Sequence, residues 1–289
     1  MACFQTKKIV IAALGAITIG ASPAAKTCPP LRVMTYNIRL DIPSDGVNRW
    51  SERREQFIGQ IRLMQPSILG LQEVVPGQKA DLEAALPGYQ FLGVARDDGR
   101  AKGEFSNLAV DRTTFRVQSS GTFWLSPTPT VPSKGWDAAY PRIATWAKLV
   151  RRSDRRRFLV LNTHLDHEGV TARLEAARQI IRWLDTHRAK SETVILTGDL
   201  NAEPSTPPLQ QLTRQLHDAR SVSKTPAVGP DGTFNAFTLV PAESRRIDYV
   251  LVDPSVKVER YAVLAWHGEG GRPASDHFPV VADLRACGK

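Results

Sequence analysis

The residues best suited to chemistry stand at the ends of strand-like runs. Each run is apolar or alternating and then stops at a carboxylate, amide or imidazole side chain. The clearest runs are LRVMTYNIRL with Asn37, SILGLQEV with Glu73, RRFLVLNTHL with His164, and TVILTGDLN with Asp199 and Asn201. Carboxylate and amide oxygens suit a hard cation such as Mg²⁺, and imidazoles hold or transfer protons. The pattern predicts a polar site along one edge of a sheet.

The segment NTHLDHEG, residues 162–169, allows two interpretations. In the first, His164, Asp166 and His167 belong to a zinc site, because the segment is similar to the H-x-H-x-D-H signature of metallo-β-lactamase-type hydrolases. Asn162 replaces the first histidine of that signature, and the other polar clusters stay unexplained. In the second interpretation His164 alone is catalytic, and the other two residues line the substrate pocket or steady the loop.

Two segments between the strand-like runs have helical periodicity. SERREQFIGQIRLM is expected to begin with Ser51 as its N-cap, and VTARLEAARQIIRWLDTH places an apolar stripe from Val170 to Leu184 on one face. Strands that alternate with helices predict an α/β fold.

The basic segment RRSDRRR, residues 151–157, is predicted to be the turn of a hairpin between ATWAKLV and RFLVLNTH. The second strand runs from this turn towards His164, so the turn is expected at the far end from the polar site and exposed to solvent. The start of the first strand, with Trp136, Asp137 and Arg142, then lies near His164. Arg142 is either a clamp for a phosphate group or a surface arginine at a strand end.

The N-terminus has the features of an export signal: two lysines, the apolar run IVIAALGAITIGA and small residues before Lys26. We expect residues 1–25 to be a signal peptide cleaved after Ala24 or Ala25, and residues 26–289 to form a single domain. The apolar run has about 13 residues, fewer than a membrane-spanning helix needs. The sequence therefore predicts a periplasmic or secreted protein.

Export would leave two cysteines in the mature chain, Cys28 and Cys287, which lie at its two ends. They either form an end-to-end disulfide or remain two unpaired thiols. The net charge of the whole chain is +9, with 38 Lys and Arg against 29 Asp and Glu. Such a charge favours polyanions in general and discriminates little between nucleic acid, phosphorylated polymer and membrane surface.

Taken together, the polar motifs resemble those of the endonuclease/exonuclease/phosphatase superfamily of metal-dependent phosphoesterases. The similar motifs follow the order of that family and span residues 34–280: MTYNIR, LGLQEV, GEF, NTHLDH, TGDLN, IDYVLV and SDHFPV. The resemblance implies a four-layered α/β sandwich of the DNase I type, with two packed, mainly antiparallel sheets flanked by helices. It also implies hydrolysis of phosphate esters by an activated water with Mg²⁺, or with Mn²⁺ in its place.

The resemblance gives these residues roles. Glu73 is the expected principal metal ligand, and Asn37 and Asp276 have suitable ligand chemistry. Asp199 is expected to orient or deprotonate the attacking water, and Asn201 to donate a hydrogen bond to the transition state.

The remaining candidates are histidines, their acidic partners and substrate contacts. His277 is expected to bind the scissile phosphate while Asp248 orients it, and His164 is expected to pair with Glu104. Arg142 and Asn162 are the candidate substrate contacts.

The expected substrate is a phosphate ester: nucleic acid, a sugar or inositol phosphate, or a phospholipid headgroup. A secreted non-specific nuclease and a non-catalytic binding module on the same fold are the alternatives to a general phosphoesterase. No motif indicates an obligate protein partner, and a monomer is expected.

Overall fold

The computed structural model describes residues 1–4, 28–240 and 244–287. The predicted signal peptide falls mainly on residues 5–27, outside the described residues. Within the described ranges we find no helix with both the length and the apolar character needed to cross a bilayer.

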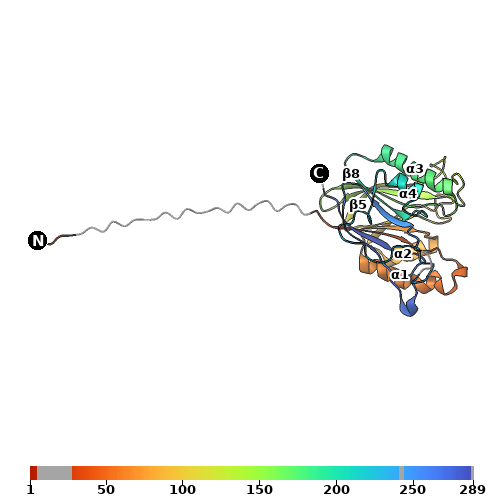
Figure 1. Cartoon of the computed structure of the whole chain (residues 1–289), viewed down its shortest axis with the longest axis horizontal. Helices are drawn as coiled ribbons and strands as arrows, with labels where there is room; N and C mark the ends of the chain where they lie inside the picture. The colour runs from red at the N-terminus through yellow and green to blue at the C-terminus, as the bar shows by residue number, and fades with distance from the viewer. Residues whose placement is uncertain (5–27, 241–243, 288–289) are drawn as a thin grey trace.

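The described chain folds around two six-stranded sheets (Figure 1). The first sheet has the order β11-β12-β1-β2-β4-β3 and the second the order β5-β6-β7-β8-β10-β9. The strands of the first are β1 (Leu31–Asn37), β2 (Ile68–Gln72), β3 (Tyr89–Leu92), β4 (Leu108–Asp111), β11 (Lys257–Val263) and β12 (Val280–Arg285). The strands of the second are β5 (Phe115–Trp124), β6 (Ile143–Arg151), β7 (Arg157–His164), β8 (Glu192–Asp199), β9 (His217–Asp218) and β10 (Asp248–Val252).

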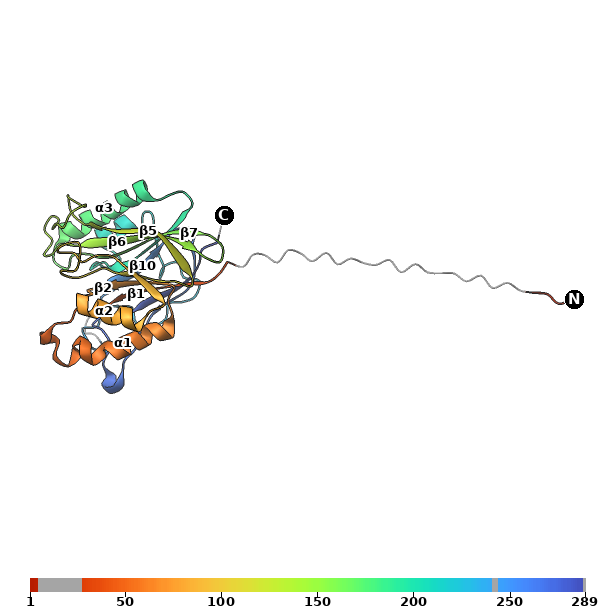
Figure 2. The ribbon, with the colours of Figure 1, turned by 180° about the vertical axis from the view of Figure 1, so that it is seen from behind.

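The helices lie on the two outer faces of the paired sheets (Figures 1 and 2). α1 (Trp50–Met64) and α2 (Pro76–Ala85) pack on the first sheet, and α3 (Val170–His187) and α4 (Pro207–Leu212) pack on the second. Two short 3-10 helices, η1 (Pro43–Asn48) and η2 (Glu269–Gly271), complete the described elements. Apart from the parallel pairs β1–β2 and β7–β8, the strands pair antiparallel. The predicted four-layered sandwich is confirmed.

Side chains that point alternately to the two faces of a strand explain why each sheet packs both on the other sheet and on helices. In β1, Leu31 and Val33 point into the core between the sheets, whereas Met34 and Tyr36 point into the core beneath α1 and α2. Successive side chains of a strand point to opposite faces, so a central strand with apolar residues at both parities is buried on both sides. The sequence thereby specifies a sheet covered on each face.

The helix predictions hold with small differences at their ends. Helix α1 begins at Trp50 with Arg49 in the capping position, so Ser51 lies inside the helix and bonds to Glu52. Helix α3 spans the predicted residues, but its buried stripe is displaced from the predicted one, and Val170 is 69% exposed.

Strand register brings the polar strand ends together. In β7 and β8, His164 is paired with Asp199, and in β8 and β10, Asp199 is paired with Asp248. In the other sheet β1 ends at Asn37 beside Gln72, so Glu73 follows directly. The ends of strands from both sheets therefore meet at one edge of the sandwich.

The predicted hairpin is present, because β6 pairs antiparallel with β7 from Ala144 opposite Thr163 to Val150 opposite Arg157. The prediction of a fully solvated turn is wrong for Arg151, which is buried. Its guanidinium pairs with Asp154 and donates to the carbonyl oxygens of Pro29 and Ala286 at 3.3 and 3.0 Å. Arg151 therefore ties the two ends of the domain to the hairpin.

The two terminal cysteines also meet at this end of the molecule. Cys28 and Cys287 are both free thiols in the structure. Burial and a side-chain hydrogen bond with Cys287 raise the pKa of the Cys28 thiol. β1 pairs with β12, with Leu31 opposite Leu284, so the first and last strands are neighbours. A disulfide between the two thiols needs little movement of the chain.

We predict that oxidation joins Cys28 to Cys287 and raises the thermal midpoint. Closing a long loop restricts the unfolded chain, an effect of about 2–5 kcal/mol. Intact mass and thiol titration of the oxidised mature protein would detect the bond, and Cys28→Ser should remove the gain in midpoint. Two titratable thiols after oxidation would contradict the prediction.

Candidate active site

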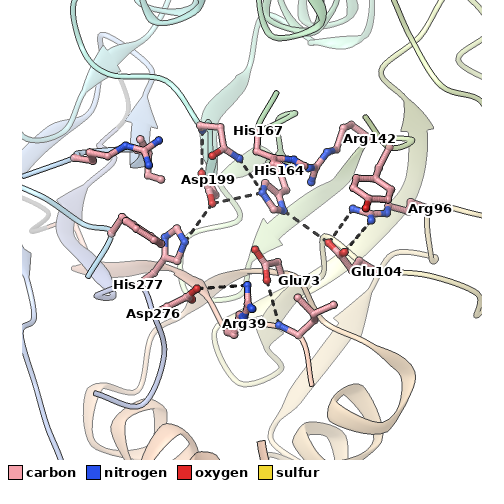
Figure 3. A pocket seen from close by; sticks show the side chains of 16 residues that line it. Arg39, Glu73, Arg96, Glu104, Arg142, His164, His167, Asp199, Asp276 and His277 are labelled. Atoms are coloured by element: carbon pink, nitrogen blue, oxygen red, sulfur yellow. Dashed lines mark hydrogen bonds and ion pairs between the residues drawn. The ribbon is translucent and has the colours of Figure 1, made fainter. Parts of the chain in front are cut away.

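The strand ends open into a pocket of about 580 Å³ (Figure 3). Eight of the residues predicted from sequence line it: Glu73, Glu104, Arg142, His164, Asp199, Asn201, Asp276 and His277. The other three predicted residues, Asn37, Asn162 and Asp248, have no exposed surface and lie behind the pocket wall.

His277 is held in place by Asp248. The two side chains are 2.8 Å apart between Nδ1 and Oδ2, and the carboxylate can only accept, so Nδ1 carries a proton. Burial acts to lower the pKa of His277, but Asp248 and then Asp199 outweigh it and raise the pKa well above its ordinary value. The imidazolium is therefore charged, and Nε2 lies 3.7 Å from Asp199. This geometry agrees with the predicted orienting role of Asp248.

Asp199 lies at the centre of the pocket, and each of its carboxylate oxygens accepts a hydrogen bond that fixes its position. The backbone N–H of Asn201 donates to Oδ1 at 2.9 Å, and the amide of Asn37 donates to Oδ2 at 3.0 Å. Burial and the nearby charge of Asp248 raise the pKa of Asp199 to about 7. A carboxyl group with such a pKa can accept a proton from water near neutral pH.

Asn37 differs from its predicted role as a metal ligand. Its Oδ1 accepts the backbone N–H of Arg39 at 3.0 Å, which fixes the orientation of the amide because that N–H can only donate. Its Nδ2 consequently points at carboxylates and donates to Glu73 at 2.9 Å and to Asp199. An amide nitrogen does not ligate Mg²⁺, so Asn37 positions two acidic side chains instead.

The carboxylates of Glu73 and Asp276 fit a divalent cation. Glu73 follows β2 with a left-handed backbone (φ 61°), and its Oε2 accepts the N–H of Leu40 at 3.2 Å. Burial and the charge of Glu73 raise the pKa of Asp276 to about 6, which shows that the two anions repel each other. Arg39 lies 3.7 Å from Asp276 but is already paired through two nitrogens with Asp45. Carboxylate oxygens are the ligands that Mg²⁺ prefers.

A second group of acidic and histidine side chains in the pocket could also offer ligands to a cation. Among the described residues, Asp199, Asp248 and His277 offer ligand atoms within 4.8 Å of one another. The Nδ1 atom of His277 is occupied by Asp248, and a charged imidazolium has no free lone pair. The oxygens of Glu73 and Asp276 therefore suit a divalent cation better than this group does.

His164 is close to Glu104 but is not hydrogen-bonded to it. The Nδ2 atom of Asn201 faces the carbonyl of Leu165 at 3.0 Å, so it is a nitrogen, and it also donates to His164 Nε2 at 3.0 Å. The proton of His164 is then on Nδ1, which is 4.0 Å from Glu104. With both amide hydrogens used, Asn201 holds the imidazole in this structure and has none left for the predicted transition-state bond.

Glu104 has a different partner, Arg96, which the sequence did not single out. Two nitrogens of Arg96 bind the carboxylate at 2.8 and 2.9 Å. Burial, followed by the charges of Arg142 and Arg96, lowers the pKa of His164 well below its ordinary value. His164 is therefore neutral. Arg96 comes from the loop after β3, where no periodic pattern marks a residue for the site.

Asn162 does not contact the pocket, and the prediction that it binds substrate is corrected. It bridges the two sheets: its amide donates to the carbonyls of Leu71 and Asn107, both at 2.9 Å. Its oxygen accepts from Gln72 at 2.7 Å and Thr197 at 3.0 Å. Every polar atom of the side chain is used, and the residue has no exposed surface.

We expect Asn162→Ala to destabilise the fold by about 2–4 kcal/mol, because four buried partners lose a hydrogen bond. Thermal unfolding would measure the change, and the activity per folded molecule should stay within about twofold since the pocket is untouched. A normal thermal midpoint with a raised KM would instead restore the substrate-binding role.

Asp166 and Asp137 fix the loops around Arg142. Asp166 accepts backbone N–H groups of Ala139 and Gly169 and the Nε of Arg142, at 3.1, 2.8 and 3.2 Å. Asp137 lies outside the pocket and caps α3 by accepting N–H groups of its first turn. Arg142 is buried and lines the pocket, so it is not the surface arginine of the other interpretation. Trp136 does not line the pocket.

The zinc interpretation of residues 162–169 is not supported. Asp166 is committed to backbone groups and Arg142, while Nδ1 of His167 accepts Nη2 of Arg142 at 3.0 Å. The part of the chain that the structure describes contains no three-ligand group with His164 and His167.

The two-sheet sandwich and the cluster of acidic and histidine side chains at its edge point to the family that the polar motifs resemble. The model of the Endonuclease/Exonuclease/phosphatase family matches residues 34–277, and the chain belongs to this family. The order of the sequence motifs and the observed fold therefore both agree with this family.

Solved structures of similar proteins come from bacteria and animals. A mannosyl-6-phosphatase of Bacteroides thetaiotaomicron is 36% identical, with 88% of this chain and 99% of that chain covered and a TM-score of 0.82. An endonuclease/exonuclease/phosphatase family protein of the same organism is 34% identical, with 89% and 98% covered and a TM-score of 0.84. The human Nocturnin catalytic domain, 21% identical with 89% and 95% covered and a TM-score of 0.69, shows the fold alone.

Among curated proteins, an uncharacterized protein of Acanthamoeba polyphaga mimivirus is 26% identical over 165 residues. The match covers 55% of this chain and 61% of the viral protein.

Proposed function

We propose that the protein is an exported hydrolase of phosphate esters that uses Mg²⁺, or Mn²⁺ in its place, and acts on sugar phosphates. The observation that carries the reaction class is the convergence of Asp199, His277 and the Glu73–Asp276 pair in one pocket. The similarity to a mannosyl-6-phosphatase supports the sugar phosphate as substrate.

The side chains divide the reaction between them. A water oxygen attacks phosphorus while Asp199 takes its proton, and the bond from phosphorus to the ester oxygen breaks with its electron pair going to that oxygen, which takes up a proton from solvent to leave as an alcohol. The His277 imidazolium, held by Asp248, stabilises negative charge on a phosphoryl oxygen. Glu73 and Asp276 would hold the cation, which would supply further positive charge to the transition state when bound. Neutral His164, held by Asn201, is placed to donate from Nδ1 rather than to act as a second cation.

The pocket volume favours a small ester over duplex nucleic acid. A volume of about 580 Å³ is typical of sites for small molecules. The alcohol part of the ester would have to lie between two protein loops, which suits a sugar better than a wide double helix.

A substrate panel tests this proposal. Release of phosphate from mannose 6-phosphate and of nitrophenol from p-nitrophenyl and bis(p-nitrophenyl) phosphate is compared with cleavage of plasmid DNA, each with Mg²⁺ and with EDTA. We expect mannose 6-phosphate to be the best substrate and EDTA to stop its hydrolysis. Efficient DNA cleavage would favour the nuclease alternative, and no turnover of any ester would favour a non-catalytic binding module.

Export is the other part of the proposal, and it is supported by the N-terminal sequence alone. N-terminal sequencing of protein recovered from the periplasm or medium should begin at Ala25 or Lys26. Full-length protein retained in the cytoplasm would contradict it.

A further inference from the structure

One end of the pocket is built from three loops that meet away from His277: the loop after β3, the loop before β6 and the loop after β7. Figure 3 shows Arg96 and Arg142 on the other side of His164 and Glu104 from His277. Tyr140 and His167 also line this end, which we call the arginine end. None of these side chains takes part in the proton transfers described above.

Arg142 offers a donor with no partner. Its Nε binds Asp166 at 3.2 Å and its Nη2 binds His167 at 3.0 Å, which fixes the guanidinium. Arg142 is only 5% exposed, and its Nη1 is buried without a hydrogen-bond partner among the described residues. A buried donor without an acceptor is unfavourable unless a ligand supplies one.

Tyr140 supplies a fixed aromatic ring beside this donor. The Arg96 guanidinium lies 4.9 Å from the centre of the ring, and the ring stacks on His167 at 5.9 Å with an angle of 16°. Half of Tyr140 remains exposed at the pocket. An aromatic ring held by two neighbours offers a flat apolar surface at low entropy cost.

We propose that the arginine end binds the alcohol part of the ester as a sugar ring, with the apolar face of the sugar against the exposed half of the Tyr140 side chain and a hydroxyl oxygen accepting from Arg142 Nη1. This proposal rests on the proposed function, because it describes the group that leaves the phosphate. Tyr140 and Arg142 then determine substrate specificity rather than the chemical step.

The charges at this end favour a neutral ring over a second anionic group. Each arginine is already paired with one carboxylate, Arg96 with Glu104 and Arg142 with Asp166. Neither pair carries a net charge, so this end of the pocket offers hydrogen-bond donors and acceptors without an excess of positive charge. A ring that carries several hydroxyl groups and one apolar face matches such a surface, whereas a second phosphate would need unpaired cations.

Binding measured without turnover tests the proposal. In mature Asp199→Asn protein with Mg²⁺, calorimetry gives the Kd values of mannose 6-phosphate, glycerol 2-phosphate and adenosine 5′-monophosphate. We expect mannose 6-phosphate to bind at least about tenfold more tightly than glycerol 2-phosphate. Adding Tyr140→Ala or Arg142→Lys should reduce this preference about tenfold, and Tyr140→Phe, which keeps the ring, should preserve it.

An unchanged preference in Tyr140→Ala and Arg142→Lys, with normal thermal midpoints, would overturn the proposal. Equal weakening of both phosphates by Arg142→Lys would place Arg142 at the phosphate itself and also contradict it. Tighter binding of adenosine 5′-monophosphate than of mannose 6-phosphate would overturn the choice of a sugar ring. Because turnover is measured separately in the unmodified protein, failure of the proposed hydrolysis is distinguishable from failure of this subsite.

Discussion

Asp199→Asn is expected to lower kcat about 10²- to 10⁴-fold and to leave KM nearly unchanged. The amide keeps the shape of the carboxylate, and its oxygen can still accept one of the two hydrogen bonds, from the Asn201 backbone or from Asn37, while its nitrogen can only donate. It cannot take a proton from water, which is the step assigned to Asp199. Steady-state phosphate release at saturating substrate and Mg²⁺ measures the effect.

The control for this variant is Asp185→Asn, which makes the same change at an exposed position of α3 outside the pocket. It should retain the activity of the unmodified protein. If Asp199→Asn retained kcat as well, the water would have to be activated by another group, and His164, neutral and 3.5 Å from Asp199, would be the next candidate.

Loss of the cation is the second large effect. We expect EDTA to abolish hydrolysis and added Mg²⁺ or Mn²⁺ to restore it. Glu73→Gln removes one of the two carboxylates assigned to the cation, so the apparent affinity for Mg²⁺ should fall at least about 10- to 100-fold. Calorimetric titration with Mg²⁺ measures the affinity directly, and the Mg²⁺ dependence of kcat measures its consequence.

Glu83→Gln on α2 serves as the matched control, because Glu83 is exposed and pairs only with Lys79 in the described structure. Its Mg²⁺ affinity should equal that of the unmodified protein. Unchanged Mg²⁺ binding in Glu73→Gln would move the cation to the Asp199, Asp248 and His277 group.

Strand periodicity predicted an α/β fold with a polar edge, and the family resemblance added the layers and most of the pocket residues. Apolar alternation located the strands, and polar residues at their ends had to meet once β7, β8 and β10 paired in register. The strand pattern predicted that His164 and Asp199 lie at one edge, and the family resemblance added Asp248, which the register places beside Asp199.

Contacts between loops could not be predicted in the same way. The partner of Glu104 depends on how the loop after β3 folds back, and no periodic signal places Arg96 there. The direction in which an amide points is also invisible in a sequence. Asn37, Asn162 and Asn201 were predicted as a metal ligand, a substrate contact and a catalytic donor, but their neighbours decide whether each contacts metal, substrate or protein.

Arg151 illustrates a related limit. Arginine-rich turns are usually solvated, and only the proximity of both chain ends gives this one two buried carbonyl partners. Long-range contacts of this kind arise from topology, which local composition does not encode.

The most direct test of the proposed active site is the initial rate of phosphate release from mannose 6-phosphate by the mature protein with Mg²⁺, with EDTA, and after Asp199→Asn. The proposed site predicts rapid release with Mg²⁺ and at least about a hundredfold lower rates in the other two conditions. Equal rates in all three would show that neither the cation nor Asp199 is needed and would contradict it.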